Sequence, residues 1–457
     1  MQLTEHIFRE YDIRGIVAED LTGDIPEWIG RAFGSELRAG HDGRSDLRVV
    51  VGHDNRPSSP ELAGKVVDGL RAAGVNVVFI RTVPTPVLYW AVESLDADGG
   101  IQITGSHNPP EYNGFKMLAD GTSFYGAAIQ RLKERIKSRT FEDGEGGVEE
   151  RSVLGDYMDD VAGRFELERP VKVVVDCGNG AASLVAVELL ERIGADVVPL
   201  YCESDGTFPN HHPDPTVDEY IADLIDRVRS EGAEAGIGFD GDADRIGAVD
   251  ENGEIVRGDL LLLLFALDVI EQTGEGLPLV FDVKCSQAVP DVLEEHGGTP
   301  IMWKTGHSLI KEKMKETGAP VAGELSGHIC FADDYYGFDD AVYAACRLVD
   351  LLAHSDRSLG EQVDAFPEYV STPEIRVDVT EAEKFEIVDR AVAAFSETHE
   401  VIDVDGARVL FEGGWGLIRA SNTQPVLVLR FEARTEAQLE SIRATMKGWL
   451  RSQGVQL

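Results

Sequence analysis

Short apolar runs and amphipathic stretches alternate from the N-terminus to about residue 365. The apolar runs are rich in Val and Ile and predict buried strands at residues 47–51, 75–80, 171–175, 197–200, 235–239, 278–282 and 300–303. The amphipathic stretches predict helices at residues 59–73, 183–193, 217–230, 260–272 and 309–315. Continuously apolar strands that are separated by helices indicate parallel, buried sheets in α/β layers.

The pattern changes after residues 366–373, where prolines and polar residues predict a linker. The remainder predicts a strand at 374–379, a helix at 381–398, further strands and a last helix at 435–450, which is an α+β arrangement. A charged, glycine-containing stretch at 141–150 and a turn at 250–254 indicate two more boundaries. We therefore expect four domains, at residues 1–150, 151–253, 254–367 and 368–457.

The first loop with candidate chemistry is Thr104-Gly105-Ser106-His107-Asn108-Pro109-Pro110, which follows the strand-like residues 100–104. A serine at the tip of a strand is exposed to a ligand and could accept a phosphoryl group, which would bring nearly two negative charges. The alternative is a plain turn in which Ser106 and Asn108 satisfy backbone groups. The loop does not match the nucleophile elbow of hydrolases, because Asn108 stands where a glycine is required.

The second loop places three carboxylates, Asp240, Asp242 and Asp244, at alternate positions. Their hard oxygens favour Mg²⁺ over a thiophilic metal, and Arg245 beside them could hold a phosphate oxygen. A calcium loop of the EF-hand kind is disfavoured, because Arg245 occupies the position of its required glycine and the flanks are strand-like. A solvated acidic turn remains the plainer alternative.

Two later loops offer groups that could bind a sugar and an anion. The run 323–328 supplies Glu324, Ser326 and His328, which could grip vicinal hydroxyls, although a strand-end turn has the same composition. The run 419–423 supplies an arginine and short polar side chains in a turn, which is typical of an anion site: Arg419, Ser421, Asn422 and Thr423. Several other residues could contribute at the same sites, and each alone also fits a structural role: Arg14, Lys116, Lys284 and His307.

The composition of the chain limits the possible binding partners and the cellular compartment. The chain has 82 acidic and 42 basic residues and a net charge of −40, which argues against nucleic acid or an anionic membrane surface as a partner. Only 12 of its basic residues are lysines, and such an acidic surface suits a salt-rich cytoplasm. Five scattered cysteines indicate reduced thiols. The most apolar run, of about eight residues, is shorter than the roughly 20 that cross a bilayer, and residues 1–14 lack a signal core, so we expect a cytoplasmic protein.

Taken together, these motifs resemble the α-D-phosphohexomutase superfamily, and within it the bacterial phosphomannomutase/phosphoglucomutase type. The resemblance runs from residues 8–15 to residues 419–425 and is densest at 281–285, 302–311 and 337–340. It implies an α/β fold: three related α/β domains with mixed sheets, followed by a C-terminal α+β domain, arranged around a central cleft.

The resemblance also implies roles for these residues. Ser106 would carry a phosphoryl group, and Mg²⁺ would be held by Asp240, Asp242, Asp244 and a phosphoserine oxygen. The candidates for proton handling and charge stabilisation are Arg14, Lys116 and His328. The substrate would be bound by Tyr11, His107, Arg245, Lys284, His307, Glu324, Ser326, Arg419, Ser421, Asn422 and Thr423.

The reaction implied is the interconversion of a hexose 1-phosphate and a hexose 6-phosphate, of mannose or glucose, through a sugar 1,6-bisphosphate that also serves as activator. The nearest alternative is a phosphoglucosamine mutase; Leu325 and Asn422 favour the mannose or glucose type. A metal-dependent sugar phosphatase and a non-catalytic phosphosugar-binding protein are further alternatives. We expect a monomer or a weak dimer.

Overall fold

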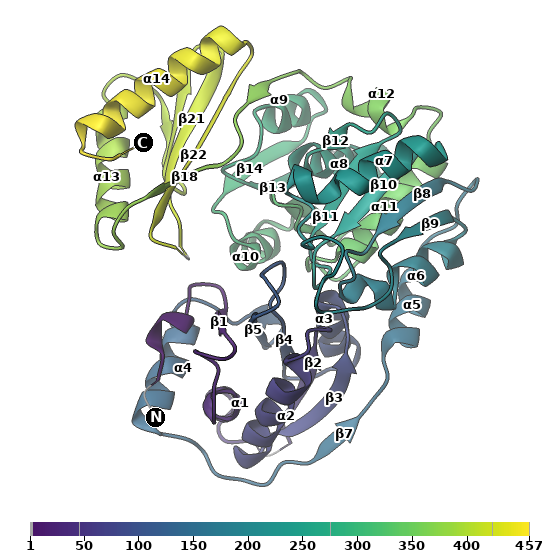
Figure 1. Ribbon diagram of the computed structural model, residues 1–457, viewed down its shortest axis with the longest axis vertical. Coiled ribbons are helices and arrows are strands. Elements are labelled where there is room, and N and C mark those ends of the chain that lie inside the picture. Colours follow the sequence, from purple (N-terminus) through teal and green to yellow (C-terminus); the bar gives the residue numbers. More distant parts are fainter. Residues whose placement is uncertain (1–2, 45, 275, 423, 457) are drawn as a thin grey trace. The chain divides into compact units, whose positions relative to one another are not determined.

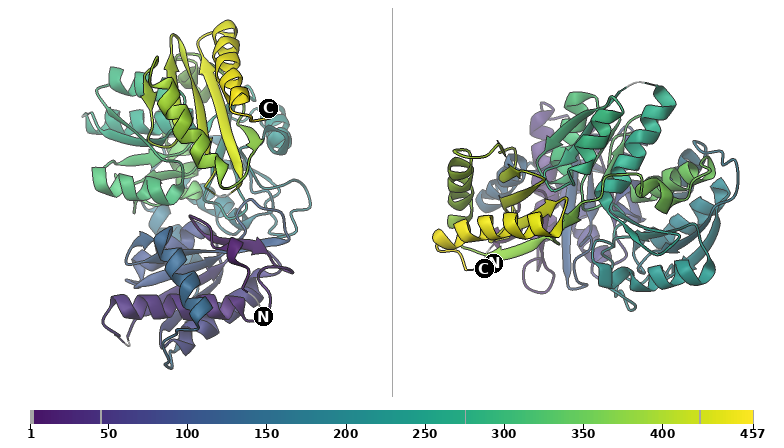
Figure 2. Two further views of the ribbon diagram at one scale, coloured as in Figure 1. Left: turned by 90° about the vertical axis from the view of Figure 1, so that its left-hand side faces the viewer. Right: turned by 90° about the horizontal axis from the view of Figure 1, so that it is seen from above.

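The computed structural model describes residues 3–44, 46–274, 276–422 and 424–456. It divides into two compact units: Met1–Gly258 with Ser326–Gly360, and Asp259–Leu325 with Glu361–Leu457. Figure 1 labels many of the helices and strands of both units, and Figure 2 gives two further views. The central cleft and the limits of the four domains remain predictions, because they depend on how the chain is divided and how its parts are arranged.

The first sheet is mixed. Its strands are β1 (Ile13–Ile16), β2 (Arg48–His53), β3 (Asn76–Thr82), β4 (Gly99–Ile103), β5 (Tyr112–Ala119), β6 (Thr122–Ser123) and β7 (Val148–Glu150). Strand β2 pairs in parallel with β3 and β4, and β3 pairs in parallel with β7. Strand β5 runs antiparallel to β4, β1 and β6. The predicted parallel sheet therefore has an antiparallel side, and Ser106 lies in the connection from β4 to β5.

Helices cover both faces of this sheet. They are α1 (Ile25–Gly40), α2 (Ser59–Ala72), α3 (Thr85–Ser94) and α4 (Ala127–Ser138), with a 3₁₀ turn η1 (Glu5–Ile7) before β1. Apolar side chains of α1, α2 and α4 share one core with Ile101 and Ile103 of β4. Gly100 on the opposite face of β4 lies against Leu88 and Val92 of α3. Successive residues of β4 thus point into two different apolar layers, as the period of a strand requires.

The second sheet repeats the mixed design. Its strands are β8 (Lys172–Asp176), β9 (Asp196–Leu200), β10 (Ala235–Phe239), β11 (Ile246–Asp250) and β12 (Ile255–Val256). Strand β8 pairs in parallel with β9 and β10, whereas β10, β11 and β12 form an antiparallel meander. The turn at 250–254 lies inside the hairpin of β11 and β12, so this sheet continues past the turn that predicted a boundary.

Helices surround the second sheet, and two of them depart from their predicted ranges at their starts. They are α5 (Leu154–Ala162), η2 (Ala181–Leu184), α6 (Ala186–Ile193), η3 (Asp218–Ile221), α7 (Ala222–Glu231) and, from later in the chain, α11 (Ala341–Ala353). The predicted helices at 183–193 and 217–230 both begin as 3₁₀ turns. Strand β16 (Ile329–Phe331) precedes α11 in the same compact unit.

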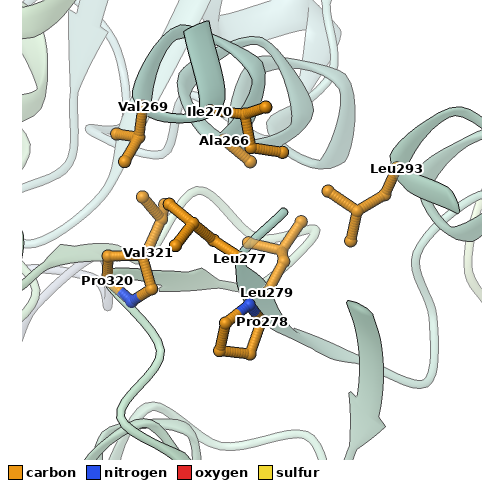
Figure 3. A pocket seen from close by; sticks show the side chains of 9 residues that line it. All are labelled: Ala266, Val269, Ile270, Leu277, Pro278, Leu279, Leu293, Pro320 and Val321. Carbon is orange, nitrogen blue, oxygen red and sulfur yellow. The ribbon is translucent and has the colours of Figure 1, made fainter. Parts of the chain in front are cut away.

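The second unit contains a parallel group of three strands, in which β13 (Pro278–Asp282) lies between β14 (Thr299–Trp303) and β15 (Val321–Gly323). The surrounding helices are α8 (Gly258–Thr273), α9 (Ala288–Glu295) and α10 (His307–Thr317), and α12 (Leu359–Val363) follows later. Figure 3 shows a gap between α8 and these strands that is lined by Ala266, Val269, Ile270, Leu277, Pro278, Leu279, Leu293, Pro320 and Val321. Every lining side chain is apolar, so the gap is a small space within the hydrophobic core and offers no polar group to bind a phosphosugar.

The fourth sheet is antiparallel, as the α+β prediction for the C-terminal part requires. Its strands are β17 (Val370–Ser371), β18 (Ile375–Asp378), β19 (Val401–Ile402), β20 (Ala407–Phe411), β21 (Gly414–Ala420) and β22 (Val426–Ala433). Helices α13 (Glu383–Phe395) and α14 (Glu436–Ser452) share one core with Ile418 and lie along the sheet in Figures 1 and 2. Trp415 and Leu417 of β21 pack into a separate cluster with Val283.

Two predictions on bulk properties can be compared with the structure. All five cysteines are free thiols, as predicted. None of the described helices is long and apolar enough to cross a bilayer.

Candidate active site

Ser106 is buried in the loop between β4 and β5. Its hydroxyl donates to Asp240 Oδ2 at 2.9 Å and lies 3.1 Å from His107 Nδ1, while its backbone N–H donates to Thr104 Oγ1 at 2.8 Å. Its φ angle is +48°, in the left-handed region that few residues other than glycine adopt. The structure therefore holds the predicted phosphoryl acceptor in one strained backbone conformation, directly against the first acidic residue.

The three predicted acidic residues form one cluster in the loop between β10 and β11. Asp240, Asp242 and Asp244 are fully buried, and one oxygen from each lies within 4.8 Å of the others. Asp240 Oδ1 also accepts from the backbone N–H groups of Asp244 and Arg245, at 3.1 and 3.2 Å. These bonds wrap the loop around the first carboxylate and turn the other two toward the same point.

Lys116 of β5 supplies the cation of this cluster. Its ammonium group donates to Asp242 Oδ2 at 2.8 Å and to Asp244 Oδ2. Burial alone would lower the pKa of Lys116, but the charges of Asp242, Asp244 and Asp240 outweigh it and raise the pKa. Lys116 is therefore a fixed positive charge, which favours charge stabilisation over proton transfer among the two roles predicted for it.

The acidic cluster has carboxylate oxygens that are available to bind a cation. Burial and the neighbouring Asp242 and Asp244 raise the pKa of Asp240 well above its ordinary value. Among the residues that the structure describes, no group donates a hydrogen bond to Asp242 Oδ1 or Asp244 Oδ1, although both atoms are buried. Buried carboxylate oxygens without a donor are costly, and a divalent cation would relieve both features. The flanking elements are strands, so the EF-hand alternative is excluded.

Thr85 is a further contact that sequence reasoning missed. At the start of α3, its hydroxyl donates to Asp242 Oδ2 at 2.5 Å, and its N–H donates to the Asp242 carbonyl at 2.9 Å. Burial would raise the pKa of Asp242, but Lys116 and the Thr85 hydroxyl lower it overall. Only the Pro84-Thr85-Pro86 helix start gave a signal in the sequence, and it did not point to the acidic loop.

Arg245 and His328 belong to a buried chain of polar contacts. Arg245 Nε lies 3.0 Å from His328 Nε2, and His328 Nδ1 lies 2.9 Å from Asp339 Oδ2 and 3.7 Å from Asp244 Oδ1. A guanidinium group can only donate, so His328 Nε2 accepts in its contact with Arg245. Sequence reasoning did not select Asp339 as a site residue, although it lies in the run 337–340.

Arg14, His107 and Tyr11 border the same loops. Arg14 of β1 donates to Asn108 Oδ1 at 3.3 Å and pairs with Asp12 at 2.5 Å. Burial lowers the pKa of His107, and the cations Arg245 and Arg14 lower it further, so this ring is neutral at pH 7. Tyr11 is half-buried just before β1.

Lys284, Glu324 and His307 come together within the second unit. Lys284 lies 3.8 Å from Asp282 Oδ2 and 3.6 Å from Glu374 Oε2. Burial would lower the pKa of Lys284, but Asp282, Glu374 and Glu324 raise it, so Lys284 stays charged. Glu324 accepts from the N–H of Gly306 at 2.6 Å, immediately before His307 begins α10.

A carboxylate ties the predicted anion loop to another segment of the second unit. Asp405 Oδ2 accepts from Arg419 Nε and from the Thr305 N–H, both at 3.0 Å. Sequence reasoning missed Asp405, which holds Arg419 beside the segment that leads to His307.

Lys384 supports the same loop from α13. This buried lysine donates to the carbonyls of Ser421 and Gln424, at 2.6 and 3.2 Å.

Three further residues were predicted to bind the substrate. Ser326 and Asn422 are half-buried, and Thr423 lies outside the described residues.

Comparison with known proteins gives a family for the whole chain. Models of the α/β/α domains I, II and III and of the C-terminal domain of phosphoglucomutase/phosphomannomutase match residues 5–143, 155–253, 257–369 and 374–448. The phosphomannomutase/phosphoglucomutase of Pseudomonas aeruginosa is 47% identical over 452 residues, which cover 98% of this chain and 96% of the relative. A phosphoglucomutase of Neisseria gonorrhoeae is 44% identical over 455 residues, which cover 98% of each.

The fold agrees with these relatives. A crystal structure of a phosphoglucomutase/phosphomannomutase family protein from Burkholderia thailandensis matches with a TM-score of 0.93 and 44% identity, over 99% of this chain and 98% of that one. The four matched domain models account for the three α/β parts and the antiparallel C-terminal part. This chain belongs to the phosphoglucomutase/phosphomannomutase family, within the α-D-phosphohexomutase superfamily.

Proposed function

We propose that this protein is a phosphohexomutase that interconverts hexose 1-phosphates and hexose 6-phosphates of mannose or glucose through a phosphoserine at residue 106. The observation that carries the proposal is the 2.9 Å contact of the Ser106 hydroxyl with Asp240 inside a buried cluster of three carboxylates and a lysine. A serine in a plain turn would have no need of such a cluster. The names of the relatives from Pseudomonas aeruginosa and Neisseria gonorrhoeae support the same reaction class.

Mg²⁺ is the metal that we assign to Asp240, Asp242 and Asp244, together with an oxygen of phosphorylated Ser106. The donors are all hard oxygens, and two of them are buried without a hydrogen-bond donor among the described residues. When bound, the ion would neutralise charge on the phosphoryl oxygens during transfer.

Other residues of the chain position the reacting groups and stabilise charge during phosphoryl transfer. In a loose phosphoryl-transfer transition state, the protein contributes mainly position and charge. Lys116 remains protonated among its carboxylate partners, and Arg245 adds a second cation whose charge acts on His107 in the serine loop. Asp240 Oδ2 holds the proton of the Ser106 hydroxyl, which aligns the oxygen lone pairs when the serine takes back a phosphoryl group.

The loops at residues 323–328 and 419–423, with His307 and Lys284, provide the groups for the far end of the substrate. We assign the phosphate that is not being transferred to Arg419, Ser421, Asn422 and Thr423, and the sugar hydroxyls to Glu324, Ser326 and His307, with Lys284 as a nearby cation. A 1,6-bisphosphorylated sugar has a phosphate at each end, so the same groups serve both halves of the reaction after the intermediate turns around. The sugar 1,6-bisphosphate is therefore both intermediate and activator.

Mannose and glucose phosphates are the substrates that the sequence favours, through Leu325 and Asn422. A phosphoglucosamine mutase is the second candidate, and kcat/KM for mannose, glucose and glucosamine 1-phosphates separates the two. We further propose that the protein works in the cytoplasm as a monomer or weak dimer, without nucleic acid or membrane partners. Four domains, at residues 1–150, 151–253, 254–367 and 368–457, would each supply one of the loops.

Mass analysis of the peptide that contains Ser106 tests the central claim. The purified protein should carry a mass gain of about 80 Da on this peptide, as expected for one phosphoryl group, and a hexose monophosphate should remove it. The Ser106→Ala variant should lack this gain and lose at least about 1,000-fold in kcat, since the acceptor atom is gone. Equal turnover by the variant would refute the mechanism, and release of inorganic phosphate at every turnover would indicate a phosphatase instead.

A further inference from the structure

Arg56, which follows β2, makes an unusually complete set of contacts. An arginine has five N–H donors, and here all five are used. Nη2 donates to the carbonyls of Ser106 and Asn108, at 2.7 and 2.6 Å. Nη1 donates to the carbonyls of Pro109 and Tyr112, at 2.6 and 3.2 Å, and Nε donates to Asp54 Oδ2 at 3.0 Å. Three of the five bonds therefore go to the loop that holds Ser106, and a fourth goes to Tyr112, the first residue of β5.

The loop is built to fit this guanidinium group. The side chain of Arg56 is fully buried, and a Cβ atom on Gly105 would lie only 2.5 Å from its Cζ, so no larger residue fits there. Asp54, the ion-pair partner, also accepts from the Gly105 N–H at 3.1 Å. One ion pair thus grips both ends of the loop, at the exit from β4 and at the entry to β5.

The contact with the Ser106 carbonyl controls the orientation of the serine. The peptide bond is planar and trans, so the carbonyl of Ser106 and the N–H of His107 point in opposite directions. Because Arg56 holds this carbonyl, the peptide between Ser106 and His107 cannot rotate, which fixes the ψ angle of Ser106. On the other side of the residue, the Thr104 hydroxyl holds the Ser106 N–H, so the backbone of this left-handed residue is held from both sides. The carbonyl oxygens of Asn108 and Pro109 are held by the same cation, which keeps their negative ends on the guanidinium.

We propose that Arg56 is the positioning residue of the Ser106 loop, whose guanidinium group keeps the serine hydroxyl on Asp240 in the geometry that phosphoryl transfer requires. The proposal rests on the phosphoserine mechanism given above. Transfer depends on placement, and a displacement of about 1 Å can cost about 100-fold in rate. Lysine cannot replace arginine in this role, because it has three donors on one nitrogen and no planar fork.

Arg56→Lys is the first test, with steady-state kinetics on glucose 1-phosphate in the presence of glucose 1,6-bisphosphate. We expect kcat to fall about 100-fold, while KM changes less than about threefold because Arg419 is untouched. Arg347→Lys is the matched control, since Arg347 is also a buried arginine, and its ion pair is with Asp333, at 2.7 Å, rather than with Asp54 beside the Ser106 loop. The control should lose a similar amount of thermal stability and keep its kcat.

Chemical rescue separates positioning from general destabilisation. In Arg56→Ala, added guanidinium ion at a concentration below that which unfolds the protein should restore part of kcat, and ammonium ion should not. If Arg56→Ala does not fold, Asp54→Asn gives the same test of the ion pair, with a smaller expected loss of kcat.

Three outcomes would overturn the proposal. They are a kcat of Arg56→Lys within threefold of the unchanged protein, a rise in KM that accounts for the whole loss of kcat/KM, and an equal loss of kcat in Arg347→Lys. If the unchanged protein itself neither interconverts hexose phosphates nor gains about 80 Da on the Ser106 peptide, the proposed function has failed, which is a result distinct from a failure of positioning.

Discussion

Burial strongly shifts the pKa values of several charged residues in the first unit and makes their ion pairs important for stability. Lys116 is the clearest case, because two of its three carboxylate neighbours bond its ammonium group directly. Removing one partner from a buried group of charges leaves the others uncompensated, which typically costs about 3–5 kcal/mol.

Lys116→Met should therefore lower the free energy of unfolding by about 3 kcal/mol when divalent metal is removed with a chelator. Added Mg²⁺ should recover part of this loss, because the ion can compensate the carboxylates that the lysine leaves behind. Urea unfolding with EDTA and with MgCl₂, on the variant and the unchanged protein, measures both effects. Equal stability in EDTA would contradict the assignment of Lys116 as the compensating cation.

Asp340 predicts a pH effect on stability. Burial raises its pKa from 3.8 to about 6, although it accepts hydrogen bonds from the Tyr343 N–H and the hydroxyls of Tyr335 and Tyr157. A carboxyl with a raised pKa in the folded state stabilises the fold below pH about 4, and this contribution is lost as the pH rises through about 6. The difference of about two pKa units corresponds to about 3 kcal/mol.

Asp340→Asn removes this titration and keeps an oxygen that can cap α11. The unfolding free energy of the variant relative to the unchanged protein should rise by up to about 3 kcal/mol between pH 4 and pH 7. Urea unfolding of both proteins at the two pH values provides the measurement. A constant difference between the two proteins across this range would show that Asp340 does not titrate there.

At the scale of elements, the candidate site depends on two loops that nearly touch. A Cβ atom on Gly241, in the loop after β10, would lie 2.4 Å from the Ser106 carbonyl oxygen in the loop after β4. Gly241→Ala should push the loops apart and lower kcat/KM by about 100-fold. Gly64→Ala in α2 is the control, since its Cβ would meet nothing within 4 Å and alanine favours a helix interior. Unchanged activity of Gly241→Ala would show that this close approach is not needed.

Most elements could be predicted because apolar periodicity reflects burial directly. The strands at 235–239 and 278–282 match β10 and β13 residue for residue. Two other features could not be predicted. The antiparallel pairing of β4 with β5 depends on contacts between strands, and the 3₁₀ starts η2 and η3 depend on local packing, neither of which changes the apolar pattern.

At the scale of the whole molecule, charge is the dominant property. A net charge of −40 implies strong self-repulsion, which dissolved salt screens. The melting temperature should therefore rise by several degrees between about 0.05 M and about 2 M KCl, where the Debye length falls from over 10 Å to below 3 Å. Differential scanning fluorimetry measures this shift, with sucrose of equal osmolality as the control for excluded volume. A melting temperature that does not rise would show that self-repulsion contributes little to the stability of the fold.

The sequence by itself determined the α/β alternation, the α+β character of the C-terminal part and the loops that contain Ser106, Asp240 and Arg419, because these follow from local apolar patterns and residue chemistry. Only the tertiary structure decided which distant side chains serve those loops. Arg56, Thr85 and Asp405 are ordinary polar residues in the sequence, and each becomes significant through a contact with a residue at least 14 positions away. Such contacts arise from chain folding, which a local pattern does not encode.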